Sequence, residues 1–227
     1  MKTLLYKYRH AWVLLYFPIY MMWFSYLERT VTQEYHAVHI SLDDIIPFNE
    51  WFVIPYYIWF VYVVAVVAYF FLVDKKEYYR CTAFLFIGMT ICLIIYTIWP
   101  NGQMLRPDLE TLGRDNIAIR IIANLYRTDT NTNVCPSIHA FNSIACCIAI
   151  FHCSRLSKKT FLKASSVLLS ISICLSTMFL KQHSAFDVLC AFVLSIFMYI
   201  IVYVPDYSSL IARIKTRSML PKTADRQ

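Results

Sequence analysis

The sequence predicts an all-α, polytopic membrane protein with six transmembrane helices. Hydrophobic residues make up 59% of its 227 residues and charged residues only 15%, whereas about 25% of the residues of a soluble domain are charged. Several apolar runs approach the roughly 20 residues that an α-helix needs to cross a bilayer. Polar segments, alternately basic and acidic, separate these runs. We therefore expect residues 1–227 to form a single integral membrane domain.

The first half of the chain is expected to contain three of the helices. The apolar run 11–27 follows a basic start but lacks the small-x-small cleavage site of a signal peptide, so it should stay attached as the first helix. A mostly acidic segment leads to the second helix at 51–73, where Pro55 falls near the start and costs few hydrogen bonds. A short basic turn precedes the third helix at 81–99.

The second half begins with the longest polar segment, 100–136. Apolar residues recur in it at helical spacing between Leu109 and Leu125, which predicts a helix lying on the membrane surface. A turn-rich stretch then leads into the fourth helix, and a basic segment separates it from the last two. The expected spans in this half are 136–152, 161–180 and 184–204, followed by a polar tail.

The distribution of charge predicts the orientation of the helices. Segments 1–10, 74–80, 153–163 and 206–227 contain 15 of the 21 Lys and Arg residues, and the alternating segments contain the other six. Loops rich in Lys and Arg remain cytoplasmic, so we expect both termini in the cytoplasm and a multi-pass protein of the cell (plasma) membrane. The net charge of +7 then reflects topology and contact with membrane lipid, and no nucleic-acid partner is expected.

His183 and Asp187 are the first candidate pair for chemistry. Residues four apart share one face of a helix, and an aspartate inside an apolar span is costly unless it is paired. Asp187 can accept a hydrogen bond from one ring nitrogen of His183, which leaves the other nitrogen free to act as nucleophile or base. The alternative is a structural pair near the membrane surface, and the pair alone does not separate these interpretations.

The tetrapeptide Pro136-Ser137-Ile138-His139 predicts a helix start. Proline and serine are favoured there, and the free backbone N–H groups of a helix start bind anions such as phosphate. His139, one turn inside, can donate a proton to a leaving oxygen. Taken alone, however, the tetrapeptide is more typical of a serine-capped helix with a histidine at the membrane interface.

Two cations accompany the histidines on the predicted outer side. Arg106 can bind phosphate oxygens with two N–H groups, although a solvated loop arginine is the more common case. Lys181 can either contact phosphate or extend to the membrane interface. The convergence of these cations with His139 and His183 would suit transfer of a phosphoryl group.

No metal or other cofactor is expected. His36, His39, Asp43 and Asp44 lie close together but lack the spacing of a metal site, which favours a solvated loop. Most of the eight cysteines fall inside apolar runs, where a thiol behaves as a small hydrophobic group, so no disulfide framework is expected.

Together these residues resemble the type 2 phosphatidic acid phosphatase (PAP2) superfamily, which also includes vanadium haloperoxidases. The pattern of that superfamily is Lys-x6-Arg-Pro, then Pro-Ser-x-His, then Ser-Arg-x5-His-x3-Asp. The corresponding residues are Arg106-Pro107, then Pro136 to His139, then Ser176-Thr177, His183 and Asp187.

The resemblance covers about residues 95–205, which implies a PAP2-like helical bundle preceded by two accessory spans within 11–73. The amino-acid sequence around Ser176 is most similar to the branch of the superfamily that contains inositol phosphorylceramide synthases. Two family cations are replaced, because Trp99 stands in the position of the first-motif lysine and Thr177 in that of the third-motif arginine. Lys181, one turn further on, is a candidate substitute for the arginine.

The resemblance also implies roles for the site residues. His183 would attack phosphorus and form a phosphohistidine, Asp187 would orient it, and His139 would protonate the leaving alcohol without any metal. The residues that would bind the phosphate oxygens are Arg106, Lys181 and Ser137.

The expected function is that of a metal-independent membrane phosphatase acting on a lipid or isoprenoid phosphate at the outer face. One alternative is a lipid phosphotransferase that moves a phospho-headgroup to an alcohol. Another is a haem protein with His139 and His183 as axial ligands, although this would leave Arg106, Ser137 and Asp187 without a role. A transporter or an inactive protein that binds lipid phosphate is the third.

Overall fold

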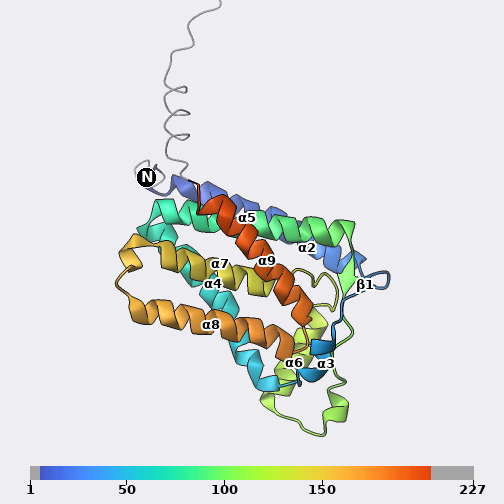
Figure 1. Ribbon diagram of the computed structural model, residues 1–227. Coiled ribbons are helices and arrows are strands. Elements are labelled where there is room, and N and C mark those ends of the chain that lie inside the picture. The colour runs from blue at the N-terminus through green and yellow to red at the C-terminus, as the bar shows by residue number, and fades with distance from the viewer. Residues whose placement is uncertain (1–5, 206–227) are drawn as a thin grey trace, which may run out of the picture.

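The computed structural model describes residues 6–205, and nearly all of their regular structure is helical (Figure 1). The expected all-α class is therefore confirmed. The start of the predicted basic segment, residues 1–5, and the predicted polar tail, 206–227, lie outside the described residues.

Four helices in the described part of the chain are long and apolar enough to cross a membrane. A fifth apolar helix, α7, has only 15 residues, which agrees with the short fourth span that the sequence predicts. The predicted count of six spans is not confirmed by length and composition. The four long helices are α4 (Val53–Val73), α5 (Lys75–Ile98), α8 (Thr160–Phe179) and α9 (Ala185–Val202), and the shorter one is α7 (Ile138–His152).

The first predicted span, 11–27, differs from the structure. The chain forms the 3-10 helix η1 (Arg9–Leu15) and then the α-helix α2 (Tyr16–Thr30). Pro18 explains the boundary, because proline has no N–H and is tolerated in the first turn of an α-helix but not in its interior. The α-helix is consequently shifted toward the polar segment, and Glu28 lies in its last turn.

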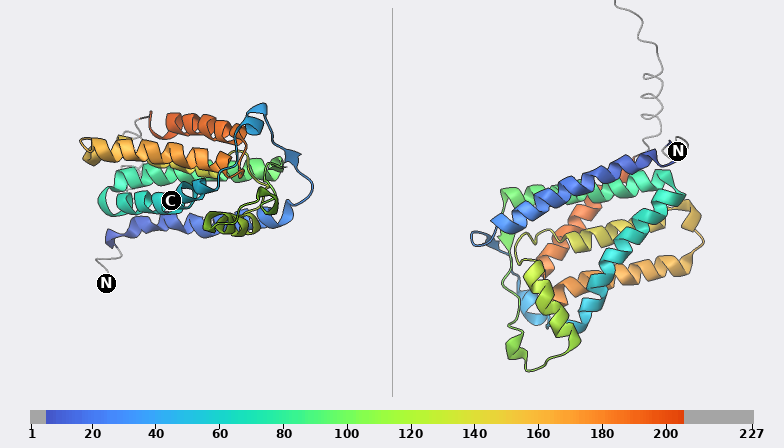
Figure 2. Two further views of the ribbon diagram at one scale, coloured as in Figure 1. Left: turned by 90° about the horizontal axis from the view of Figure 1, so that it is seen from below. Right: turned by 180° about the vertical axis from the view of Figure 1, so that it is seen from behind.

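Helix α7 lies at the centre of the bundle and packs against α4, α5, α8 and α9. It can do so because small side chains, among them Ala140, Ala145 and Ala149, are fully buried on it and allow close approach of its neighbours. Gly88 of α5 faces the Phe141 ring, where a Cβ atom would lie 1.9 Å from Cζ. Helices α2 and α9 lie on opposite faces of the bundle (Figure 2), and α2 packs along α5.

Shorter elements gather at one end of the bundle (Figure 1). Two-residue strands pair in parallel, with His36 opposite Asn101. The predicted surface helix starts later than expected, because Gly113 adopts a left-handed conformation (φ 66°) and Asn116 caps a new helix by accepting from the Ile119 N–H. The elements are β1 (His36–Ala37), α3 (Ser41–Ile45), η2 (Glu50–Phe52), β2 (Asn101–Gly102), η3 (Glu110–Leu112), α6 (Ile117–Thr128) and, at the other end of α7, η4 (Ser154–Leu156).

Candidate active site

The fold brings the two predicted histidines together. His139 lies in the first turn of α7, and His183 lies in the short loop between α8 and α9. Their ring centroids are 5.6 Å apart, and both residues line the same cavity. Ser137 is the N-cap of α7, and its hydroxyl accepts a hydrogen bond from the Ala140 N–H at 3.4 Å. The predicted helix start is therefore confirmed.

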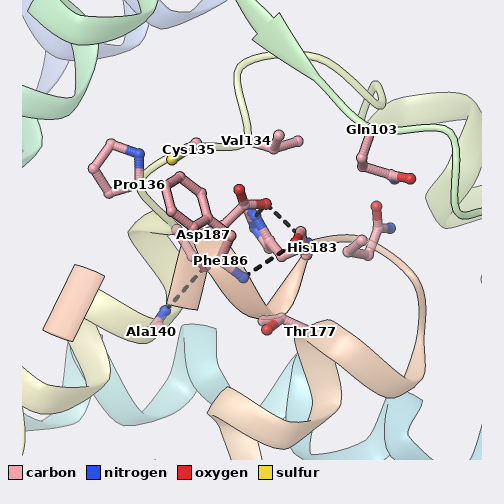
Figure 3. A network of polar contacts seen from close by, with 12 residues as sticks. Gln103, Val134, Cys135, Pro136, Ala140, Thr177, His183, Phe186 and Asp187 are labelled. Carbon is pink, nitrogen blue, oxygen red and sulfur yellow. Dashed lines mark hydrogen bonds and ion pairs between the residues drawn. The ribbon is translucent and has the colours of Figure 1, made fainter. Parts of the chain in front are cut away.

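His183 and Asp187 are in contact, but not because they share a helix face. Helix α9 begins only at Ala185, after the N-cap residue Ser184, so His183 lies before the helix. Asp187, the third helical residue, points back and accepts from the Ser184 N–H at 2.9 Å, and the same oxygen lies 3.3 Å from Nδ1 of His183 (Figure 3). Asp187 thus forms a capping box with Ser184, and both His183 and Asp187 are buried.

Asp43 supports this loop from a distant part of the sequence. Its carboxylate accepts hydrogen bonds from the Ser184 hydroxyl at 2.6 Å, the Ala185 N–H at 2.7 Å and the Ile40 N–H at 2.9 Å. Asp43 is only 2% exposed. The expectation of a solvated loop is therefore wrong for this residue. No local sequence signal pairs Asp43 with Ser184, because they are 141 residues apart.

Lys181 reinforces the same connection. Its ammonium group donates to the backbone carbonyls of Asp43 at 2.7 Å and Ile46 at 2.6 Å. Burial lowers the pKa of this lysine, while nearby Asp43 and Asp44 partly oppose the shift. Lys181 does not line the cavity that contains the histidines. In this arrangement its charge is directed at the 43–46 segment.

Arg106 is likewise bound to the backbone. Its guanidinium donates to three carbonyls of the α6 C-terminal segment, at 2.7 to 3.2 Å, and to the side-chain oxygen of Gln182. It also lies over the Tyr126 ring, 4.5 Å from the centroid. Burial lowers the pKa of Arg106. Through Gln182 it holds the residue next to His183, but it does not line the cavity.

The two residues that replace family cations have structural contacts. The Trp99 ring stacks on His36 with centroids 5.7 Å apart. The Thr177 hydroxyl donates to the Cys174 carbonyl, and the Thr177 carbonyl accepts from the N–H groups of Gln182 and His183 at 2.9 and 3.0 Å. Thr177 therefore helps to form the turn that carries His183 (Figure 3).

Helix α4 supplies site residues that the sequence analysis missed. The rings of Tyr56 and Trp59 lie against His139, with centroid distances of 4.7 and 4.3 Å. The Tyr56 hydroxyl donates to Asp129 at 2.8 Å. Their spacing of three residues would have been the available signal, because it puts both aromatic rings on one face of α4.

A cavity of about 740 Å³ extends from the two histidines between α2, α4, α5 and α7. Most of its lining is aromatic or aliphatic, and it follows α4 from Tyr56 to Phe71, a helix length of roughly 20 Å. Its polar end contains the histidines together with Glu28, Asp129 and Asn133. Within residues 6–205, no group of three or more His, Cys, Asp and Glu side chains has the arrangement of a metal site.

Comparison with known families identifies the region that carries the histidines. The family model of the PAP2 superfamily matches residues 103–207. No curated protein and no solved structure matches the chain.

Proposed function

The chain belongs to the PAP2 superfamily through residues 103–207, and on that premise we propose that it is an integral membrane phosphatase of lipid or isoprenoid phosphates. The superfamily suggests phosphatase or phosphotransferase activity toward lipid phosphates. The observation that supports the proposal is the pair His139 and His183, with rings 5.6 Å apart at the polar end of a largely apolar cavity.

His183 is the proposed nucleophile. When its Nδ1–H donates to Asp187, the lone pair of Nε2 is free to attack phosphorus. The new N–P bond forms as the bond between phosphorus and the lipid oxygen breaks, which gives a phosphohistidine and a lipid alcohol. Water then attacks phosphorus, the N–P bond breaks, and inorganic phosphate leaves with His183 restored.

His139 is the proposed acid and base. It donates its proton to the lipid oxygen in the first step and takes a proton from water in the second. The rings of Tyr56 and Trp59 hold the imidazole beside His183. The first N–H groups of α7, which have no carbonyl partner within their own helix, can hold the phosphate oxygens next to Ser137.

The cavity is the proposed site of the lipid chain. Its apolar walls suit an acyl or isoprenoid chain, because each buried CH₂ group contributes about 0.8 kcal/mol. Arg106 and Lys181 donate to backbone carbonyls, so we assign them the role of positioning the His183 loop. Either cation could contact phosphate directly only after it releases its carbonyl partners. The active site would face the outer side of the cell membrane, with both termini cytoplasmic.

A phosphotransferase is the second candidate, and one observation favours it. Among the described residues, no Lys or Arg lines the cavity. A phosphodiester carries less charge than a phosphomonoester and needs fewer cations, so headgroup transfer to an alcohol fits this lining. The first half of the reaction would be the same, with an alcohol replacing water in the second.

Phosphate release by the purified protein tests the proposal. Wild type, His183→Ala and the control His39→Ala would be assayed with EDTA on phosphatidic acid, an isoprenoid diphosphate and a sphingoid phosphate. His39 is an exposed histidine that does not line the cavity, and among the described residues its ion-pair partner is Asp44. We expect release by wild type and His39→Ala and none by His183→Ala.

Two results would overturn parts of this proposal. Wild-type activity of His183→Ala would show that another group is the nucleophile. Absence of release by any variant, together with headgroup exchange when a phospholipid and an alcohol are supplied, would replace hydrolysis by transfer.

A labelled substrate should leave acid-labile phosphate on the wild-type protein and none on His183→Ala.

A further inference from the structure

The polar end of the cavity is acidic. Glu28 from α2 and Asp129 after α6 line it together with the two histidines, while the nearby cations Arg106 and Lys181 are directed at backbone carbonyls. A phosphate group placed beside the histidines would therefore share this end of the cavity with Asp129 and with Glu28, whose pKa is raised by burial. Because like charges repel, such a site favours a substrate that carries its own positive charge.

Asp129 has one carboxylate oxygen available for a ligand. Its Oδ2 accepts from the Tyr56 hydroxyl at 2.8 Å, and Oδ1 accepts no hydrogen bond from the residues that the structure describes. The Tyr56 ring in turn lies against His139. Tyr56 therefore connects Asp129 to His139, the proposed general acid.

Two buried amides at the same end of the cavity have unpartnered atoms. Asn133 is 5% exposed and Gln182 2% exposed, and both line the cavity. The Asn133 side chain donates to Glu28 at 2.8 Å. Within residues 6–205, neither Oδ1 of Asn133 nor Nε2 of Gln182 has a hydrogen-bond partner. Asn133 also adopts a left-handed backbone conformation (φ 57°). Buried polar atoms are normally hydrogen-bonded, so these two atoms, which belong to residues that line the cavity, are available to a ligand.

We propose that Asp129, Asn133 and Gln182 form a subsite for an ammonium group, and that the substrate is a long-chain lipid phosphate with an amine a few atoms from phosphorus. An ammonium group has three donors and no acceptor. The second carboxylate oxygen of Asp129, which the Tyr56 hydroxyl does not bond, and the unpartnered Oδ1 of Asn133 can accept from it. The unpartnered Nε2 of Gln182 can donate to a phosphate oxygen. This assignment rests on the proposed function, because it names the substrate class of the same site.

A matched pair of lipids tests the subsite. One is a long-chain 2-amino-alcohol phosphate and the other is the alkyl phosphate of equal chain length without the amine. We expect wild-type kcat/KM to favour the amine by about tenfold, the effect of one charged hydrogen bond. Asp129→Asn keeps the shape of the side chain but removes its charge, and should bring the ratio close to one. Glu34→Gln, which removes an exposed outer-side charge away from the cavity, should leave the ratio unchanged.

Equal kcat/KM values of wild type for the two lipids would overturn the subsite. Equal loss on both lipids in Asp129→Asn would also overturn it, because that pattern indicates a structural role.

Binding separates failure of the subsite from failure of the proposed reaction. The rise in Tm on adding each lipid would be measured for His183→Ala with and without Asp129→Asn. Suppose that wild type turns over neither lipid, but the amine lipid raises Tm more than the lipid without the amine, and does so only when Asp129 is present. In that case the subsite stands and the phosphatase proposal fails. Turnover without any preference in rate or Tm would reject the subsite alone. Neither turnover nor preference would reject both.

Discussion

Replacing Asp43 by alanine should loosen the loop that carries His183. The substitution removes three hydrogen bonds to a carboxylate that is 2% exposed, from Ser184, Ala185 and Ile40. A hydrogen bond to a charged group contributes about 1.5–3 kcal/mol, and losses within one network do not add fully. Allowing for water that solvates the freed donors, we expect a loss of about 3 kcal/mol of local stability.

The effect on turnover follows from the position of this network next to His183, the proposed nucleophile. A displacement of about 1 Å in a reacting group can reduce the rate about a hundredfold, so kcat of Asp43→Ala should fall between roughly tenfold and a hundredfold. Amide hydrogen exchange at residues 183–186 should accelerate by about two orders of magnitude, the equivalent of 3 kcal/mol.

The matched control is Asp44→Ala. Within residues 6–205 the exposed Asp44 makes its one ion pair with the exposed His39, and it affects Lys181 through its charge without a hydrogen bond to the His183 loop. The amide exchange rates at residues 183–186 and the kcat of Asp44→Ala should equal those of wild type. Wild-type exchange at 183–186 in Asp43→Ala would refute the reasoning, whatever the activity. Faster exchange throughout the chain would instead indicate global unfolding and would remove the specific link between Asp43 and the loop.

Three further substitutions have defined outcomes. His139→Ala should slow substrates with poor leaving alcohols more than an activated aryl phosphate, because the aryl group departs without a proton; equal slowing of both would exclude an acid role. Asp187→Asn, which keeps an oxygen for the Ser184 N–H but favours the wrong tautomer of the histidine, should reduce kcat by roughly a hundredfold or more at unchanged Tm. Gly88→Ala should lower stability by about 1–3 kcal/mol through overpacking against Phe141, and Phe141→Leu in the same chain should restore part of the Tm.

Features that depend on neighbouring residues were predictable from the sequence. The apolar runs indicated the membrane helices, and Ser137 was correctly predicted to cap α7. The spacing of His183 and Asp187 indicated a contact that the structure confirms. The predicted cause was wrong, because His183 lies before α9 and Asp187 contacts it from the capping box that Asp187 forms with Ser184 at the start of that helix.

Features that depend on distant residues were not predictable. The carboxylate of Asp43 bonds a residue 141 positions away, and nothing near Asp43 in the sequence distinguishes it from the exposed Asp44. The same holds for Lys181, whose carbonyl partners lie more than 130 residues earlier. The contact of Tyr56 with His139 depends on how α4 crosses α7, which side-chain periodicity does not fix.

Helix α4 and the 41–46 segment precede the region that the PAP2 family model matches. They nevertheless supply part of the aromatic lining of the cavity, the rings beside His139 and the carboxylate that accepts from Ser184, the residue after His183. The proposed catalytic histidines and part of the proposed lipid-binding wall therefore come from different parts of the chain. Under the proposed function, variation in the first third of the chain would change which lipid is accepted while both histidines stay in place. Chimaeras joined near residue 75 would then exchange lipid preference between related chains.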